Sequence, residues 1–253
     1  MKYWNITFSP TGGTLKVADL LMHTLSQDQI YIDLTDPELD YTQIDIQADD
    51  VVLFAVPSYG GLVPETALHR LECIEGNNAK CILLTVYGNR AYEDTLIQLA
   101  DTVKSDHFQV VAAIAAIAQH AIVKTIAADR PDIKDVTTLV EYAKKISQKL
   151  QNNDTTEPII PGNRPYRTPS SFSLIPHVAN KCRKCGKCAD KCPVEAIDKD
   201  DPTSTDHNRC ISCMRCINVC PTGARKVNNI KYAACKAMLE TKASRRREPE
   251  LFI

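Results

Sequence analysis

The stretch DVVLFAVPSYGG, residues 50–61, starts with an apolar run and ends in a turn that contains proline, tyrosine and two glycines. An apolar run of this length between polar flanks is typical of a β-strand that is buried on both faces. Such strands belong to parallel sheets that carry helices on both sides. The stretch therefore predicts an α/β domain in which this strand is central.

The residues around this run alternate between strand-like and helix-like segments. The apolar patterns predict strands over 3–8, 29–34, 50–57, 80–88 and 109–118, and helices over 14–25, 65–74, 92–105 and 135–150. Regular alternation implies right-handed crossovers between parallel strands. We expect a doubly wound, five-stranded parallel sheet that occupies residues 1–151.

Length and composition narrow the class of protein further. The chain has 253 residues, 44 % of them hydrophobic, which is enough for two globular domains. No run approaches the roughly 18 apolar residues of a membrane span, and the first residues alternate like a strand and do not resemble a signal peptide. We therefore expect a cytoplasmic protein without a membrane span. Eleven cysteines in a reducing compartment indicate metal binding more than disulfides.

Beyond the first domain the pattern changes. Residues 152–176 contain five prolines and predict a semi-extended linker, followed by a second domain over 177–230 and a basic helix and tail over 231–253. Residues 176–253 carry 16 Lys and Arg against 9 Asp and Glu, whereas the rest of the chain carries 14 against 22. Opposite charges could hold the two parts together, and salt would weaken that attraction. The alternative is that these charges are only solvated surface.

Two cysteine repeats dominate the second domain. The segments CRKCGKCADKCP (182–193) and CISCMRCINVCP (210–221) share the spacing C-x2-C-x2-C-x3-C-P. Three closely spaced thiolates fit a cluster with several metal corners, whereas zinc prefers separated C-x2-C pairs around one ion. Over residues 177–230 the chain resembles bacterial-type ferredoxins, which are small α+β domains.

That resemblance implies two [4Fe–4S] clusters with crossed ligands, because the fourth cysteine of each repeat binds the other cluster in two-cluster ferredoxins. The first cysteine set is then Cys182, Cys185, Cys188 and Cys220. The second cysteine set is Cys192, Cys210, Cys213 and Cys216. The three remaining cysteines, Cys73, Cys81 and Cys235, are expected to be buried, inert thiols.

A second motif, FSPTGGT at residues 8–14, follows the first strand and opens a helix. It has neither the G-K-[ST] ending of a Walker loop nor a G-x-G-x-x-G fingerprint. Hydroxyls and glycine amides at a helix N-terminus bind phosphate without a cation. The motif resembles the phosphate loop of flavodoxins, which bind FMN, although many of these read S-x-T-G-N-T and have asparagine at the position of Gly13. The expected phosphate-binding residues are Ser9, Thr11, Gly12, Gly13 and Thr14.

Two more loops follow central strands, at the sheet edge where doubly wound folds bind ligands. PSYGG (57–61) and YGNRAYED (87–94) resemble the loops that hold the flavin ring in flavodoxins, which implies the sheet order 2-1-3-4-5. The resemblance assigns Tyr59 and Tyr87 as stacking candidates, with Tyr92 behind, and Gly60 as the residue whose peptide meets the flavin N5. His120 could donate to the flavin or be structural. The remaining expected FMN-binding residues are Pro57, Ser58, Gly61, Gly88, Asn89 and Arg90.

The whole chain resembles flavodoxin–ferredoxin fusion proteins of anaerobes. This resemblance implies transfer of electrons between two [4Fe–4S] clusters and FMN, with redox proteins as partners and no catalytic side chain. The alternatives are an FMN-dependent reductase of a quinone or nitro compound, and a redox sensor. No nucleic-acid module or NAD(P)H motif is evident, and a homo-oligomer remains an open alternative.

Overall fold

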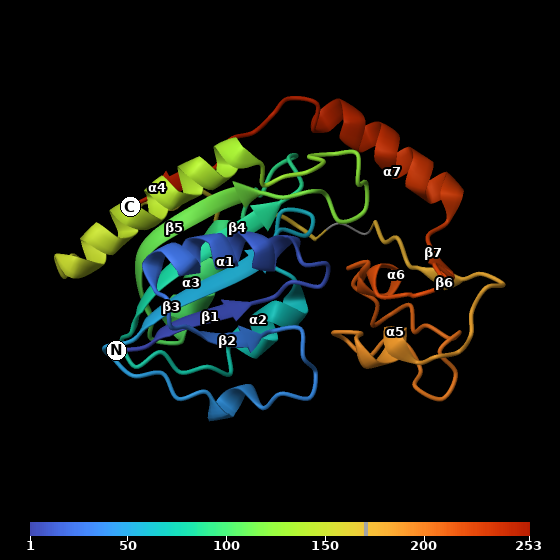
Figure 1. Cartoon of the computed structure of the whole chain (residues 1–253), viewed down its shortest axis with the longest axis horizontal. Coiled ribbons are helices and arrows are strands. Elements are labelled where there is room, and N and C mark those ends of the chain that lie inside the picture. The colour runs from blue at the N-terminus through green and yellow to red at the C-terminus, as the bar shows by residue number, and fades with distance from the viewer. Residues whose placement is uncertain (170–171) are drawn as a thin grey trace.

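The structure, a computed structural model, describes residues 1–169 and 172–253. Its main sheet has six strands in the order β2-β1-β3-β4-β5-β8 (Figure 1). The strands are β1 Tyr3–Thr7, β2 Ile30–Asp33, β3 Val51–Pro57, β4 Lys80–Tyr87, β5 Gln109–Ile117 and β8 Glu250–Phe252. The first five are parallel, so the expected doubly wound order 2-1-3-4-5 is confirmed.

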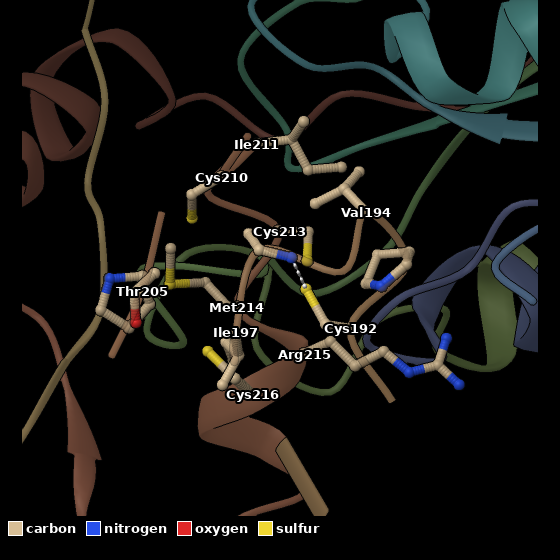
Figure 2. Close-up of a pocket in the computed structure, with 13 residues that line it drawn as sticks. Cys192, Val194, Ile197, Thr205, Cys210, Ile211, Cys213, Met214, Arg215 and Cys216 are labelled. Carbon is tan, nitrogen blue, oxygen red and sulfur yellow. Dashed lines mark hydrogen bonds between the residues drawn. The ribbon is translucent and has the colours of Figure 1, made fainter. Parts of the chain in front are cut away.

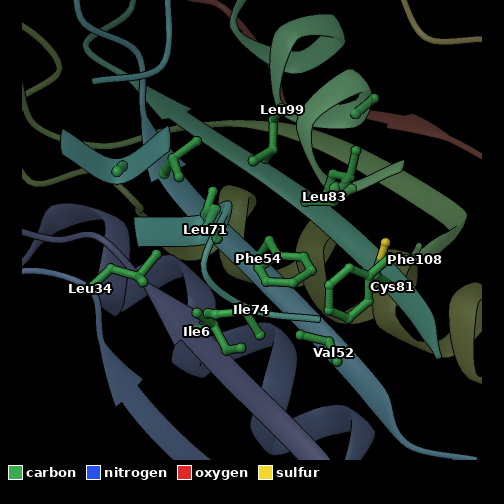
Figure 3. Packing of buried hydrophobic residues seen from close by; sticks show 14 of the residues in the cluster. Ile6, Leu34, Val52, Phe54, Leu71, Ile74, Cys81, Leu83, Leu99 and Phe108 are labelled. Atoms are coloured by element: carbon green, nitrogen blue, oxygen red, sulfur yellow. The ribbon is translucent and has the colours of Figure 1, made fainter. Parts of the chain in front are cut away.

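Helices cover both faces of this sheet. Helices α1 (Gly13–Leu25) and α4 (Ile133–Gln151) pack together on one face, and α2 (Glu65–Leu71) and α3 (Thr95–Ser105) cover the other (Figure 1). On the α2 and α3 face, Phe54 of β3 meets Phe108 edge to face with ring centroids 4.8 Å apart (Figure 3). All residues of β3 before Pro57 are buried, which agrees with the apolar run that predicts this strand.

The sixth strand comes from the C-terminal tail and differs from the five-stranded expectation. Strand β8 pairs antiparallel with β5, with Phe252 opposite Ala113 and Glu250 opposite Ala115. An edge strand exposes unpaired backbone groups, and the tail satisfies those of β5. The sequence predicts a basic helix and tail over 231–253 but no strand in it. The sheet edge captures the tail.

The proline-rich segment 152–176 is also not a free linker. Its residues Asn163 and Arg167 donate backbone N–H groups to the buried carboxylate of Asp94, at 2.9 and 2.8 Å. Arg164 and Tyr166 bind Asp101 of α3. The prolines do not exclude this packing, because Asp94 and Asp101 accept the polar groups of the extended backbone. Ser170 and Ser171, within the same predicted linker, lie outside the described residues.

The second domain is small. Strands β6 (His177–Val178) and β7 (Arg225–Lys226) form an antiparallel pair, and the four-residue helices α5 (Lys187–Asp190) and α6 (Arg215–Asn218) follow the middle cysteines of each repeat. Helix α7 (Asn229–Lys242) then leads back to the first domain (Figure 1). Its buried residues pack on Val123 and Ile126, in the loop after β5.

A 3₁₀ turn over Tyr41–Gln43 (η1) lies between β2 and β3. Cys81 and Cys235 are buried as expected, whereas Cys73 is exposed at the end of α2, so the expectation of a buried thiol is wrong there. Within the described residues, no helix is long and apolar enough to cross a membrane.

Candidate cofactor sites

The second cysteine set surrounds one cavity. All four of its members line the cavity, together with apolar side chains that include Val194, Ile197 and Met214 (Figure 2). The crossed residue, Cys192, comes from the first repeat, and the other three come from the second repeat and the start of α6. The fold therefore brings together the four sulfurs that the ferredoxin resemblance groups, across about twenty residues of sequence.

Two of these sulfurs are largely buried, and a metal that binds them has to displace their protons. Burial raises the pKa of Cys213 and Cys216 to about 12, so both stay protonated at neutral pH unless a metal takes the proton's place. The backbone N–H of Ala196 donates to Cys192 Sγ at 3.3 Å, the kind of bond that tunes iron–sulfur potentials (Figure 2). Among the described residues, no three Cys, His, Asp or Glu side chains are grouped as ligands of a single metal ion. In its chemistry, the donor set of four thiols with an apolar lining fits an iron–sulfur cluster.

The β6–β7 pair brings together the chain segments that lead to two members of the first cysteine set, Cys182 and Cys220. Val178 pairs with Arg225, and Ala179 N donates to Ala224 O at 2.9 Å, so the chains that lead to Cys182 and back to Cys220 leave the pair at the same end. Ala224 N donates to Cys220 Sγ at 3.3 Å, which repeats the Ala196 bond four residues after the crossed cysteine. Burial opposes ionisation of Cys220, but backbone and Thr222 hydrogen bonds outweigh it and lower its pKa to about 7. Cys185 is exposed.

The segments around the second cysteine set contact the first domain at the carboxyl edge of its sheet. Arg70 of α2 donates to Leu34 O at 2.6 Å and to Pro193 O at 2.7 Å, and Pro193 directly follows Cys192. Arg215, next to Cys216, donates to Thr35 just past β2, and its guanidinium lies 4.0 Å from Asp33. Ile211 packs against the core on the α2 and α3 face. These fixed contacts place the second set, rather than the first, against the flavodoxin-like sheet.

The loop after β3 reaches toward the same cysteines. Tyr59 and Leu62 exchange backbone hydrogen bonds of 2.9 and 3.2 Å, which closes a tight turn over Gly60 and Gly61. Both glycines have positive φ, 62° and 89°, as a primed two-residue turn requires. Burial, and to a lesser degree the neighbouring Cys213 thiol, raise the pKa of Tyr59 well above its usual value. Tyr59, a residue of the expected flavin loop, therefore lies near Cys213 of the second cysteine set.

The start of α1 has the features that a phosphate requires. Gly12 has a φ of 88° and faces open space, and the first intrahelical bond runs from Lys16 N to Gly12 O at 3.0 Å. Ser9 Oγ accepts the N–H of Leu15 at 2.9 Å and so shapes the loop. The amides of Gly13 and Thr14 meet no acceptor within the described chain. Two free amides and the positive end of a 13-residue helix fit an anion.

The loop after β4 departs from its expected role. Tyr87 is buried, and its ring packs against Tyr92, Ala115 and Ile117 without the free face that stacking on a flavin needs. The Tyr92 hydroxyl donates to Glu250 of β8 at 2.5 Å. Tyr87 is the last residue of β4 and pairs with Ile117 of β5. Tyr92 packs against the Tyr87 ring and binds the C-terminal tail through Glu250. Of the two expected stacking residues, Tyr87 is buried and Tyr59 is partly exposed.

Other residues of this loop and of the loop after β3 also form hydrogen bonds or ion pairs with the protein itself. Asn89 donates to Ala243 O and Arg245 O, at 2.7 and 2.9 Å, and accepts from Arg247 N at 3.0 Å. Arg90 pairs with Glu93, and Ser58 bonds the hydroxyl of Thr95 at 2.7 Å. A Cβ at Gly61 would meet Glu93 and Arg167, and one at Gly88 would meet the ring of His120. Pro57 ends β3.

The sequence does not predict the side chains that hold the C-terminal tail against the first domain. Arg130 pairs with buried Asp135, donates to Asn89 Oδ1 at 3.3 Å and donates to Arg247 O at 2.7 Å. Arg246 pairs with Asp132 at 2.6 Å. No local pattern marks these residues, because Asn89 and Arg247 lie 158 positions apart. The three consecutive arginines at 245–247 indicate that carboxylates bind the tail, but not which carboxylates.

His120 is neutral in this fold. Its Nδ1 accepts the N–H groups of Ile122 and Val123, each at 3.1 Å, so the ring proton resides on Nε2. Burial, together with Lys124 and Arg90, lowers its pKa to about 4. His120 can therefore donate one hydrogen bond from Nε2, but it is not a protonated acid at neutral pH.

Comparisons with known proteins found similarities for both parts of the chain. Residues 181–224 match the family model described as a 4Fe-4S dicluster domain. A flavodoxin of Streptococcus pneumoniae TIGR4 is 16 % identical over 59 % of this chain and 99 % of its own, with a TM-score of 0.40. Flavodoxin 1 of Bacillus cereus is 14 % identical, over 58 % and 98 %, with a TM-score of 0.41. The rubredoxin oxygen:oxidoreductase of the anaerobe Desulfovibrio gigas is 14 % identical, over 61 % and 37 %, with a TM-score of 0.44.

No curated protein matches the sequence. The fold assignment rests on the strand order 2-1-3-4-5 and the helices on both faces, and the assignment of the second part rests on the family match. The chain thus combines a doubly wound α/β domain with the flavodoxin-like strand order and a region, residues 181–224, that matches a 4Fe-4S dicluster domain.

Proposed function

We propose that this protein transfers electrons between two [4Fe–4S] clusters and one FMN. When bound, the clusters pass single electrons and the flavin stores one or two. The fusion would then connect one-electron carriers to a two-electron store. In this proposal the side chains bind, orient and shield these groups, and none reacts with a substrate.

The two clusters have different positions on the path of the electrons. The cluster of the second cysteine set exchanges electrons with the flavin, and the cluster of the first set exchanges them with the exterior. The observation that carries this order is the contact region in which Tyr59 lies near Cys213 while Arg70 binds Pro193 O. The exposure of Cys185 on the first set supports the other half.

Each group of residues has a distinct role in this proposal. The amides of Gly13 and Thr14, with the Thr11 hydroxyl, hold the phosphate of FMN at the start of α1. Tyr59 and Gly60 flank its ring. Arg70 and Arg215 fix the second cysteine set against the sheet edge. The rest of the expected ring site must come from residues other than Tyr87 and Asn89.

Anaerobic purification and reduction test the proposal. The protein should contain FMN and about eight irons, because eight cysteines at this spacing hold two four-iron clusters. Dithionite, NAD(P)H and a reduced ferredoxin are then compared as donors, with flavin and cluster absorbance followed separately. Bound zinc, or FAD in place of FMN, would contradict it. Turnover with a quinone or nitro compound would favour the reductase instead.

A further inference from the structure

The loop of the first cysteine set carries a dense group of cations, here called the basic rim. The rim comprises Lys181, Arg183, Lys184, Lys187 and Lys191, all of them exposed. They alternate with the cysteines of the first repeat, and Asp190 is the one acidic residue between positions 181 and 191. The rim therefore surrounds the exposed Cys185.

Several cations outside the rim in residues 176–253 pair with carboxylates of the chain, whereas Lys226, Lys231, Lys242, Arg245 and Arg247 form no ion pair within the described residues. Arg246 pairs with Asp132 and Glu248, Arg215 approaches Asp33, and Lys199 lies 3.5 Å from Glu38. In the rim, Lys184 pairs with Asp201 at 3.3 Å. The other four rim cations meet no carboxylate in residues 1–169 and 172–253. The densest group of unpaired positive charge along residues 176–253 thus lies in the loop of the first cysteine set, four cations within eleven positions.

The two cysteine sets also differ in what covers them. The second set faces the sheet edge through Arg70, Arg215 and Ile211, whereas within the described residues no hydrogen bond or ion pair joins the side chains of the rim to the first domain. Four unpaired cations around an exposed cluster ligand attract an acidic surface and steer its approach.

We propose that the basic rim is the docking surface for an acidic electron-transfer protein, which passes one electron to the cluster of the first cysteine set. This inference rests on the proposed function. In the step, the reduced centre of the partner loses one electron and the cluster gains it; no bond forms and no proton moves. The chemistry that recognises the partner is a ring of carboxylates around its own redox centre.

The test measures reduction of the complete, cofactor-loaded protein by two donors in anaerobic stopped flow. One donor is a bacterial ferredoxin of net negative charge, and the other is photoreduced deazariboflavin, which is uncharged. The rim variant is Lys181→Glu with Lys187→Glu. The matched control is Lys144→Glu with Lys145→Glu, two exposed lysines on α4 that give the same change of net charge.

At low salt the rim variant should react with the ferredoxin at least about tenfold more slowly than the control, since steering by charge acts on the association rate. Both variants should react equally with deazariboflavin and contain equal iron. If the rim variant loses iron, Arg183→Glu with Lys191→Glu takes its place. Salt should slow the wild-type reaction with ferredoxin and have a smaller effect on the rim variant.

Equal ferredoxin rates for rim and control variants, with normal reduction by deazariboflavin, would overturn the docking surface and leave the proposed function intact. Rim-dependent binding of duplex DNA with an unchanged ferredoxin rate would overturn it as well. Clusters that reduce while the flavin stays oxidised with both donors would instead contradict the proposed function, and the docking proposal would be withdrawn with it.

Discussion

The two cysteine sets arise from repeats of the same spacing and have different surroundings. The second set lines an apolar cavity that Arg70 and Arg215 hold against the first domain. The first set lies in a loop of exposed lysines, with Cys185 open to solvent. The repeat determines which groups can bind, whereas the surroundings determine which of the two sites faces inward. Spacing alone does not distinguish them.

The largest expected effect comes from removing the crossed ligand of the second set. Cys192→Ala should lose about half of the iron, because one of two four-iron clusters goes, and flavin reduction by an external donor should fall by about a hundredfold or more. Iron analysis and stopped-flow absorbance measure both. Cys73→Ala removes an exposed cysteine outside both sets and serves as the control. Loss of the first cluster alone would show that the ligands are not crossed.

A smaller effect is expected at Asn89, and it shows whether this residue holds the C-terminal tail or binds the flavin. Asn89→Ala leaves the carbonyl of buried Ala243 and the carbonyl of Arg245, whose bond is partly buried, without their donor. It should lower the free energy of unfolding by about 2–4 kcal/mol, as expected when several buried polar groups lose partners. Denaturant unfolding gives this value. The affinity for FMN should change little, so a large loss of FMN in a stable variant would return Asn89 to the flavin site.

The phosphate loop predicts a comparable but specific effect. Thr11→Ala should weaken FMN binding by about 1.5–3 kcal/mol, which is the value of one hydrogen bond to a charged group. Titration of the apoprotein with FMN measures it, and unfolding of the apoprotein should stay unchanged. Thr137→Ala, an exposed threonine on α4, is a matched control. An unaltered dissociation constant would mean that the loop does not hold the phosphate.

The smallest expected effect concerns salt. Opposite net charges suggest docking that salt weakens, but the described linker packs on Asp94 and Asp101, and β8 ties the other end to the sheet. Transfer from clusters to flavin within one molecule should therefore change by less than about twofold between low and high ionic strength, because exposed ion pairs contribute little. Rapid reduction followed across a salt series checks this. A steep decline would mean that charge alone holds the domains together.

Several features could be predicted from the sequence because they depend on neighbouring residues. The run before Pro57 shows a strand buried on both faces, and the spacing of the cysteines indicates clusters. Other features depend on distant partners. Tyr87 looks like a stacking residue until the tail packs near it, and Asn89 looks like part of a flavin loop until Arg247 arrives from 158 positions away. Likewise, the prolines indicate an extended linker but not the carboxylates that hold it.

The most direct test of the account is the position of the irons in an anaerobic crystal structure of the loaded protein, located by anomalous scattering. The central claim is that the cluster of the second cysteine set lies nearest the flavin. We predict that the four irons closest to the Tyr59 ring are bound by Cys192, Cys210, Cys213 and Cys216. Irons bound by Cys182, Cys185, Cys188 and Cys220 in that place would contradict the account.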